Sequence, residues 1–532
     1  MKDLTSFLQK NKPTYVSSVW VSDLGNGYYK NPVLAADYSD PDVCRVGEDY
    51  YLTASSFNCI PGLQILHSKD LVNWTIIGAA IQKLSPEAVF SQVQHGNGVW
   101  APSIRYHNGE FYIYYGDPDY GIYMTKTQHP AGEWEPPVLV KAGKGLIDAC
   151  PFWDEDGQAY LVHAFAGSRA GIKSLLAITR LTPDGKQATG QSKIIYDGHD
   201  TDVTIEGPKL YKRDHYYYIL SPAGGVATGW QLALRSPTIF GPYERKIVMA
   251  QGNTTINGPH QGAWVDTETG EDWFIHFQDT YAFGRVVHLQ PMQWVDDWPV
   301  IGEDKDGDGC GEPVLTYRKP NTGKTYPLAT PVECDDFSSK QLGWQWQWHA
   351  NTMDWWHFTN TAKGVLSLYA VPVPDHYKNL WDVPNLLLQK FPAKDFTATT
   401  KITFLPASGI TGERTGLLVM GLDYALLSLE NTDKGLVLSQ NECRNADKGS
   451  PEKTNAGVAV KENTIYLRVK VQPDASCIFS YSADGKKYQT LGIPFKAREG
   501  KWIGAKIGLF CSRPVKNNDG GRVDADWFAI GR

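Results

Sequence analysis

The sequence has no C-x-x-C pair among its eight cysteines, and it lacks H-E-x-x-H, phosphate-loop and Ser or Cys nucleophile motifs. Cysteines scattered through 532 residues argue against a zinc ribbon and against a dense disulfide scaffold. The chain also lacks an excess of basic residues, since 51 Lys and Arg against 58 Asp and Glu give a net charge of -7. We therefore expect neither nucleic acid nor a membrane as its partner.

Long apolar runs are missing too. The most apolar stretch, GLLVMGLDYALLSLE, is interrupted by Asp423 and is too short to cross a bilayer. The first fifteen residues, MKDLTSFLQKNKPTY, have no apolar export-signal core, so we expect a soluble chain without a signal peptide. A cytoplasmic location and an exported one after signal removal both fit, and the sequence does not fix the oligomeric state.

Aromatic residues are abundant: they make up 12% of the chain, with 18 Trp and 28 Tyr. Short runs rich in Val, Ile, Tyr and Trp alternate with Gly, Pro, Asn and Asp, and no long amphipathic helical pattern is present. Such runs are typical of β-strands joined by turns. The sequence therefore predicts an all-β protein.

One of these patterns repeats five times, as GEDYYLTAS, NGEFYIYYG, DGQAYLVHA, RDHYYYILS and GEDWFIHFQ. Each copy has a turn, then aromatic or small residues, then an aliphatic residue. The equivalent positions, 48 to 61 residues apart, are Tyr51, Tyr112, Tyr160, Tyr218 and Phe274. Repeats of this length predict a β-propeller of five four-stranded blades.

Residues at one offset before each repeat should face the propeller axis, because the innermost strand of every blade lines the channel. Counting back 11 to 14 positions from the equivalent aromatics gives Asp40, Trp100, Asp148, Glu206 and His260. We therefore expect three carboxylates, an indole and an imidazole to converge at one funnel.

Each acidic position also has a plain structural interpretation. Asp40 precedes Pro41, so it could simply begin a turn, and Asp148 in GLIDACPFW could be a hydrogen-bonded structural group. Glu206 in TIEGPKLY has apolar neighbours that predict a buried carboxyl, which suits either an acid catalyst or a salt bridge. Because the three residues share one offset within the repeat, together they indicate a functional site more specifically than any one of them does.

The repeat ends near residue 330, where the connector TYRKPNTGKTYPLATPVECDDF is followed by period-2 strands such as ATTKITFLP. We place a five-bladed propeller at 28–328 and a C-terminal β-sandwich at 329–532. In the sandwich, Trp344, Trp346 and Trp348 are expected to fill the core rather than to bind carbohydrate, and a binding role for this domain is the lesser alternative.

The stretch EDKDGDGCGEP resembles the start of an EF-hand loop, with Asp304, Asp306, Asp308 and Gly309. The twelfth position, however, is Leu315 rather than the bidentate Glu that calcium requires there. We interpret the stretch as an acidic turn-rich loop, with a structural cation as the lesser alternative.

Six motifs, in order, resemble glycoside hydrolase family 43: NPVLAADYSDPDVCRVGEDYYLTASSF, HSKDLVNW, WAPSIRYHNGEFYIYYG, GLIDACPFWDEDGQAYLVHA, TIEGPKLYKRDHYYYILSPAGG and GPHQGAW. They span about residues 28 to 315. DDFSSKQLGWQWQWHAN and the strands after it resemble the concanavalin-like sandwich that follows the propeller in the β-xylosidase and α-L-arabinofuranosidase branch. The resemblance thus implies an inverting glycosidase that removes arabinofuranosyl or xylosyl units.

The resemblance also implies roles for individual residues. Asp40 matches the general base, Glu206 the general acid, and Asp148 the residue that tunes and orients the acid. Arg285 in FGRVVHLQP matches an arginine that binds hydroxyls of the terminal sugar, although by itself it could form a salt bridge between blades. His260 in GPHQGAW matches a histidine near the axis that coordinates calcium through water in some members, although a satisfied core histidine is equally compatible.

Phe57 and Trp100 match aromatic positions around the terminal sugar, with hydrophobic filling between blades as the alternative. We list Phe57, Trp100, His260 and Arg285 as substrate-binding residues. The resemblance implies no required cofactor and no metal ligand in the site, while leaving room for a structural calcium. The partner that it implies is a plant-derived oligosaccharide or polysaccharide.

We expect an exo-acting inverting enzyme that releases terminal α-L-arabinofuranosyl units, with β-D-xylosyl units accepted in the same pocket. The motif FQDTYAFGRVVHLQPMQW favours arabinofuranose. The alternatives are a dedicated β-xylosidase, a retaining fructan hydrolase of the same two-domain plan, and a carbohydrate-binding propeller without catalysis. The parent polysaccharide and the linkage are not encoded in any motif that we identify.

Overall fold

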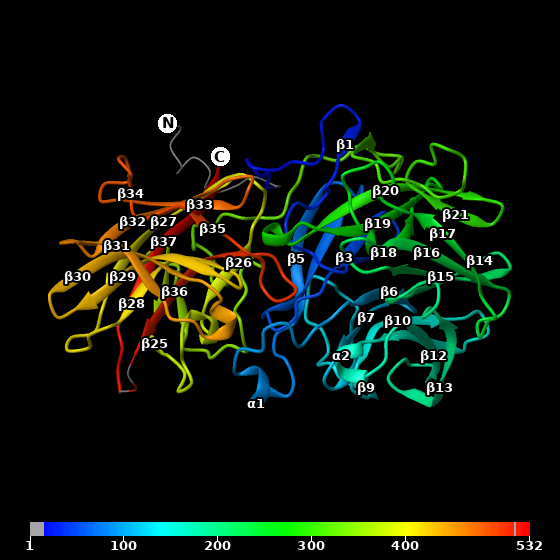
Figure 1. Cartoon of the computed structure of the whole chain (residues 1–532), viewed down its shortest axis with the longest axis horizontal. Coiled ribbons are helices and arrows are strands. Elements are labelled where there is room, and N and C mark those ends of the chain that lie inside the picture. Colours follow the sequence, from blue (N-terminus) through cyan, green and yellow to red (C-terminus); the bar gives the residue numbers. More distant parts are fainter. Residues whose placement is uncertain (1–14, 515, 517) are drawn as a thin grey trace.

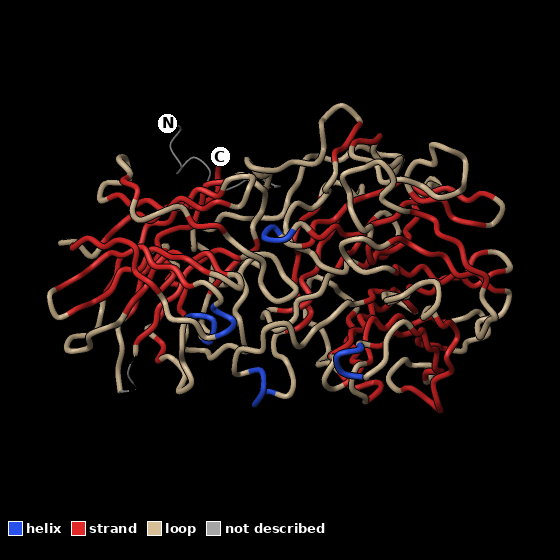
Figure 2. Tube along the Cα trace, viewed as in Figure 1, coloured by secondary structure: helices blue, strands red, loops and turns tan. Residues whose placement is uncertain are grey.

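The computed structural model describes residues 15–514, 516 and 518–532, and almost all of its regular structure is β-strand (Figure 2). The N-terminal segment in which we expect no export signal lies, apart from its last residue, outside the described residues. No helix in the described ranges is long and apolar enough to cross a membrane. The helices are single turns: α1 (Glu87–Phe90), α2 (Gly167–Ala170), η2 (Tyr281–Phe283), η3 (Leu380–Asp382) and η4 (Ala446–Lys448).

Five four-stranded antiparallel sheets follow one another along the chain, and in each the strands pair in sequence order. They form the propeller on the right of Figure 1 and confirm the predicted fold class. The first three sheets are β2–β5 (Asp42–Val46, Asp49–Thr53, Gly62–Ser68, Trp74–Ile81), β6–β9 (Ser103–His107, Glu110–Asp117, Gly121–Thr127, Val138–Ala142) and β10–β13 (Leu146–Trp153, Ala159–Phe165, Leu175–Leu181, Ala188–Asp197). The other two are β14–β17 (Lys209–Arg213, Tyr216–Ala223, Trp230–Ser236, Glu244–Met249) and β18–β21 (His260–Asp266, Asp272–Asp279, Arg285–Val295, Trp298–Ile301).

The repeated aromatic position lies on the second strand of every blade, namely β3, β7, β11, β15 and β19. Tyr112, Tyr160, Tyr218 and Phe274 are buried and Tyr51 is partly buried. All except Tyr218 belong to or pack against the apolar clusters between neighbouring sheets. The first strands of neighbouring sheets contact one another, for example β2 with β6 and β18 with β2, so these strands surround the axis. The spacing therefore predicted the number of blades.

The ring closes where the first and fifth sheets meet. Strand β1 (Tyr28–Lys30) pairs with β22 (Thr316–Arg318), and Leu34 forms an isolated bridge with Val287 on β20. The Asn31 side chain accepts a hydrogen bond from the Leu289 N–H and donates to the Leu289 and Val314 carbonyls. Residues on both sides of the five sheets thus hold the ring shut.

The C-terminal region is a sandwich of two sheets, at the left of Figure 1. One sheet contains β23 (His357–Asn360), β24 (Val365–Tyr369), β37 (Arg522–Gly531), β27 (Phe396–Leu405), β32 (Thr464–Val471), β33 (Ser476–Ser482), β34 (Gln489–Thr490) and β35 (Phe495–Lys496). The other contains β25 (Val371–Pro372), β36 (Lys506–Arg513), β26 (Leu387–Lys390), β28 (Arg414–Met420), β29 (Tyr424–Thr432), β30 (Gly435–Cys443) and β31 (Lys453–Ala459). Their facing side chains form one apolar core.

Trp346 and Trp348 are buried in this core, as expected, whereas Trp344 is only half-buried and does not belong to it. Their segment is not a regular strand, because it pairs only through isolated bridges, one of which joins Trp348 to Ile60 of the propeller. The two domains therefore share an interface. The last propeller strand ends at Ile301 and β23 begins at His357, so our boundary at 328 and 329 falls in the connecting segment and stays a prediction.

Candidate active site

A cavity of about 130 Å³ opens where the innermost propeller strands begin. Six of the seven residues singled out from the sequence line it: Asp40, Phe57, Trp100, Asp148, Glu206 and Arg285. They come from all five blades, two of them from strands and the others from segments beside the strands. We call Asp40, Asp148 and Glu206 the pocket carboxylates.

Asp40 directly precedes β2, and two hydroxyls hold its carboxylate. Ser39 Oγ and Ser55 Oγ donate hydrogen bonds to Asp40 Oδ2 at 2.7 Å and 2.6 Å. Arg285 Nη1 lies 3.5 Å from the other oxygen, Oδ1, and donates to Ser39 Oγ at 2.7 Å. These donors fix the orientation of the carboxyl that we expect to act as the general base.

Asp148 lies within β10 and is 4% exposed. The register of β10 against β11 shifts between Ile147 and Cys150, so a bulge re-aims this side chain. Its Oδ2 accepts a hydrogen bond from the Gly207 N–H at 2.8 Å, which ties it to the segment that carries Glu206. Burial raises the pKa of Asp148 well above its ordinary value, and repulsion from Glu206 and Asp40 adds to this rise.

Glu206 lies between β13 and β14, and its backbone N–H donates to the Pro222 carbonyl. Contrary to the expected burial, its side chain is 27% exposed and faces the cavity. Glu206 Oε1 lies 2.9 Å from His260 Nε2. The least buried of the pocket carboxylates is thus the one that we predicted to protonate the leaving group.

His260 begins β18 and does not line the cavity. It lies behind Glu206 at 1% exposure, with its ring 5.4 Å from that of Phe277. Its Nδ1 has no hydrogen-bond partner within the described part of the chain. The structure thus places this predicted substrate-binding residue next to Glu206, where it can orient the carboxyl.

Several residues around the cavity hold a left-handed backbone. Asp40, Phe57 and Asp148 have φ of 54°, 51° and 59°, and Gln261 has 36°. Such angles cost a non-glycine residue on the order of 1–3 kcal/mol, and they concentrate at functional sites. The strained backbone orients these side chains at a cost in stability. This favours a functional over a purely structural interpretation of Asp40 and Asp148.

The sequence analysis missed one residue of the cavity, Trp502, because it belongs to the other domain. The loop at 498–504 of the sandwich reaches the propeller and places this indole, 45% exposed and with φ of 64°, at the cavity. Its ring centroid lies 6.3 Å from that of Trp100, edge to face, and 5.9 Å from the Arg285 guanidinium. An aromatic residue in the glycine-flanked sequence GKWIG was the available signal.

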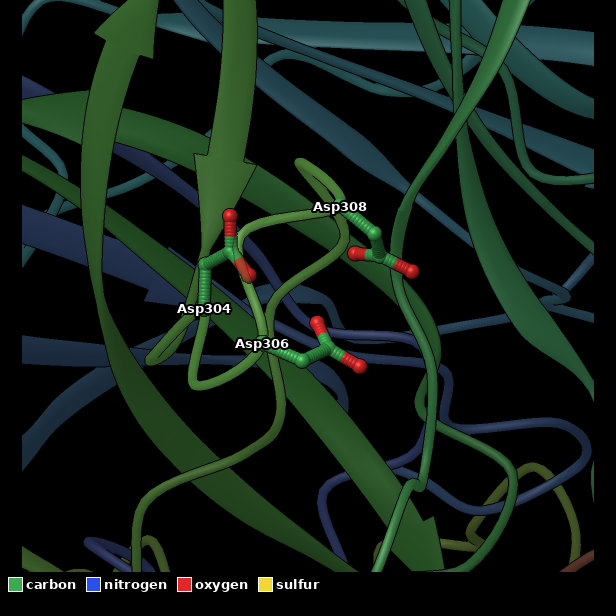
Figure 3. A group of neighbouring side chains, drawn as sticks. All are labelled: Asp304, Asp306 and Asp308. Carbon is green, nitrogen blue, oxygen red and sulfur yellow. The ribbon is translucent and has the colours of Figure 1, made fainter.

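The acidic loop lies between β21 and β22 (Figure 3), and its residues do not line the cavity. Asp304, Asp306 and Asp308, which we call the loop carboxylates, are exposed and offer oxygens within 4.8 Å of one another. Asp304 already accepts hydrogen bonds from the Gly307 and Gly309 N–H groups, and Asp308 accepts one from Cys310. These bonds describe the turn-rich loop that we expected.

A calcium ion needs six to eight oxygen ligands, and the loop carboxylates supply only part of such a set. Across the described ranges they form the only group of three or more His, Cys, Asp or Glu side chains with metal-ligand spacing. His260 belongs to no such group among the described residues. A structural calcium remains an expectation from the family resemblance, and no catalytic step is assigned to it.

The sequence profile of glycosyl hydrolases family 43 matches residues 29–299, and that of the beta xylosidase C-terminal concanavalin A-like domain matches residues 334–530. A putative beta-xylosidase of Xylanibacter ruminicola is 40% identical, over 91% of this chain and 86% of its own length. A beta-xylosidase of Formosa agariphila is 33% identical, over 95% and 90%.

A non-reducing end alpha-L-arabinofuranosidase of Bacteroides ovatus is 27% identical, with 96% of each chain covered. Among solved structures, the family 43 protein BlXynB of Bacillus licheniformis superposes with a TM-score of 0.81 at 27% identity, over 94% of this chain and 99% of the other. The profile match and the 40% identical relative agree with the propeller and its convergent carboxylates. This chain therefore belongs to glycosyl hydrolases family 43 and is a glycoside hydrolase.

Proposed function

We propose that this enzyme removes single terminal pentosyl residues, β-D-xylosyl units first, from the non-reducing ends of plant-derived oligosaccharides. The observation that carries the proposal is the meeting of three carboxylates, two indoles and an arginine around one small cavity. Its volume of about 130 Å³ is well below the roughly 300–1,000 Å³ of sites for drug-sized ligands. A pocket of this size suits one sugar unit rather than a chain, which favours exo action.

In the proposed mechanism, Asp40 deprotonates a water molecule that attacks the anomeric carbon, and Glu206 protonates the departing glycosidic oxygen. Two hydroxyl donors and Arg285 hold the Asp40 carboxyl in place for this role. Glu206 suits the acid role because it faces the cavity and is partly exposed. An inverting enzyme needs roughly 6.5–9.5 Å between the two carboxyl groups, so that the water fits between them.

Asp148 touches neither water nor leaving group in this mechanism. Burial, together with repulsion from Glu206 and Asp40, raises the pKa of Asp148 well above its ordinary value, so Asp148 keeps a proton to a higher pH than an isolated carboxyl would. Through the Gly207 N–H, Asp148 also fixes the segment that presents Glu206. We assign it the tuning and orientation of the acid.

The xylosyl preference follows the names of the relatives that are 40% and 33% identical over nearly the whole chain. It reverses the order that the sequence motif near Arg285 favoured. Arabinofuranosyl release is the second candidate, because the Bacteroides ovatus relative that carries that name aligns over 96% of both chains. Both sugars are pentoses, so one pocket could hold either.

Hydrolysis of 4-nitrophenyl β-D-xylopyranoside, α-L-arabinofuranoside and β-D-fructofuranoside tests the sugar. We expect the largest kcat/KM on the xyloside, a smaller one on the arabinofuranoside and no turnover of the fructoside. Proton NMR during hydrolysis of xylobiose tests the stereochemistry: α-xylose should appear first. First-formed β-xylose would exclude the inverting mechanism, and inactivity on both pentosides would exclude the proposed substrate class.

A further inference from the structure

One buried carboxylate outside the cavity joins the two domains beside the candidate active site. Asp37, three residues before Asp40, is 5% exposed and does not line the cavity. Its Oδ1 accepts a hydrogen bond from the Arg285 N–H at 2.8 Å. Its Oδ2 accepts one from the Gly504 N–H of the sandwich at 3.0 Å.

These two bonds reach both sides of the pocket. Arg285 starts β20, and its guanidinium lies beside Asp40, whereas Gly504 ends the loop that carries Trp502. The Tyr38 N–H also donates to the Arg285 carbonyl at 2.9 Å, so the segment 37–38 binds both backbone groups of Arg285. Asp37 therefore fixes the spacing between the propeller arginine and the sandwich indole.

The backbones at this point approach so closely that only glycine fits. A Cβ on Gly504 would lie 2.7 Å from the Gly284 nitrogen and 2.8 Å from its Cα. Gly284 has φ of 75°, and a Cβ there would lie 2.5 Å from Cβ of Asp37. One residue further on, the Ala505 N–H donates to the Ala282 carbonyl at 2.8 Å. The contact is thus a continuous backbone junction rather than a single surface pair.

Asp37 also interacts with a nearby amine. Lys390 on β26 is half-buried, with its Nζ 3.7 Å from the centroid of the Tyr38 ring. Desolvation lowers the pKa of Lys390 to about 7, and attraction to Asp37 opposes this fall. The two backbone donors therefore provide most of the compensation for burying the carboxylate. An uncharged side chain could not accept hydrogen bonds of the same strength from the Arg285 and Gly504 N–H groups at once.

We propose that Asp37 is a positioning residue that holds Trp502 of the sandwich against Arg285 of the propeller, so that the second domain completes the sugar pocket. This inference rests on the proposed function, and it deepens that function by naming what sets the distance between the two pocket walls. We call the two hydrogen bonds that Asp37 accepts, from Arg285 and Gly504, the clamp. Loss of the clamp should weaken sugar binding while leaving the pocket carboxylates in place.

The test is a double-mutant cycle on the xyloside with Asp37→Asn and Trp502→Ala. We expect Asp37→Asn to lower kcat/KM about tenfold, mainly through KM, since it removes one hydrogen bond to a charged acceptor. In the Trp502→Ala background the same change should cost less than about twofold, because its target is already absent. Equal losses in both backgrounds would overturn the inference.

Two variants and one spectroscopic measurement separate positioning from simple destabilisation. Gly504→Ala leaves Asp37 unchanged but wedges the junction apart, and it should reproduce the rise in KM. Glu413→Gln is the matched control, because Glu413 is a fully buried carboxylate that also accepts from two backbone N–H groups, those of Ala407 and Gly521, within the sandwich. It should leave KM unchanged even if it lowers the melting temperature.

Labelling with 5-fluorotryptophan gives a readout that does not depend on turnover. The Trp502 resonance, assigned by its loss in Trp502→Phe, should shift and broaden in Asp37→Asn and stay unchanged in Glu413→Gln. An unchanged resonance in Asp37→Asn overturns the clamp. If the wild type is inactive on the pentosides but the Trp502 resonance still shifts in Asp37→Asn, the proposed substrate is overturned and the clamp is supported.

Discussion

The pocket carboxylates come from segments of three different blades, whereas the loop carboxylates lie within five consecutive residues of a single loop. The first group lines one cavity, and its oxygens bind groups from other segments of the chain. The second group is exposed, and its oxygens cap the N–H groups of their own turn. The loop carboxylates are neighbours in sequence and stabilise a turn. The pocket carboxylates, to which we assign the catalytic roles, are brought together only when the propeller ring closes.

The largest expected difference between the two groups is in turnover. Glu206→Gln should lower kcat on xylobiose about 10²–10⁴-fold, because it removes the proton donor for the leaving group. Binding of xylobiose, measured by calorimetry, should persist. Asp308→Asn is the matched control and should keep wild-type kcat. A Glu206→Gln enzyme with more than about a tenth of wild-type activity would contradict our assignment of the acid.

A smaller effect is expected at the buried member of the pocket group. Asp148→Asn should lower kcat about 10–100-fold, since the Glu206 segment loses a charged partner at the Gly207 N–H. Steady-state kinetics on xylobiose measure this loss, and a variant that keeps more than about half of wild-type kcat would contradict the role assigned to Asp148.

The same substitution should raise stability at neutral pH. The native pKa of Asp148 lies above its unfolded value, so the native state binds more protons and the free energy of unfolding falls as pH rises from about 4. Asp148→Asn removes this penalty and can still accept from Gly207. Denaturant unfolding at pH 4.5 and pH 7.5 should show that the free energy of unfolding falls less between these two pH values in the variant than in the wild type. Equal losses would mean that the carboxyl is ionised at little cost.

The smallest effect is expected in the loop group. A variant with Asp304, Asp306 and Asp308 all changed to Asn should keep kcat within about twofold and unfold within a few degrees of wild type, because exposed groups contribute little and Asn can still cap a turn. Melting scans with 1 mM calcium and with EDTA complete the comparison. A calcium-dependent rise in melting temperature that the triple variant loses would assign a cation to this loop.

The sequence predicted the propeller because its repeat is local: one turn and one aromatic strand recur at every blade. It also predicted the convergence of Asp40, Asp148 and Glu206, since residues at equal offsets must face one axis. The exposure of Glu206 was missed, because apolar neighbours in sequence do not decide what lies beside a side chain in space.

Contacts between the domains left no periodic trace in the sequence. Trp502 lies in a single glycine-flanked turn, and nothing in its neighbourhood names the propeller as its partner. Asp37 resembles any acidic residue before a turn until Gly504 is brought to it. The docking of two folded surfaces depends on the three-dimensional shape of both. Phe57 and Trp100 could therefore be inferred from motifs, whereas Trp502 on the opposite wall of the pocket could not.

The closure of the ring also sets an order of events during synthesis. Asp40 leaves the ribosome with the first sheet, and its partner Arg285 follows 245 residues later. A nascent chain that ends before β20 holds its base without the guanidinium beside it, and the indole of Trp502 emerges later still. Catalytic competence is therefore acquired only after the segment that carries Trp502 has been made.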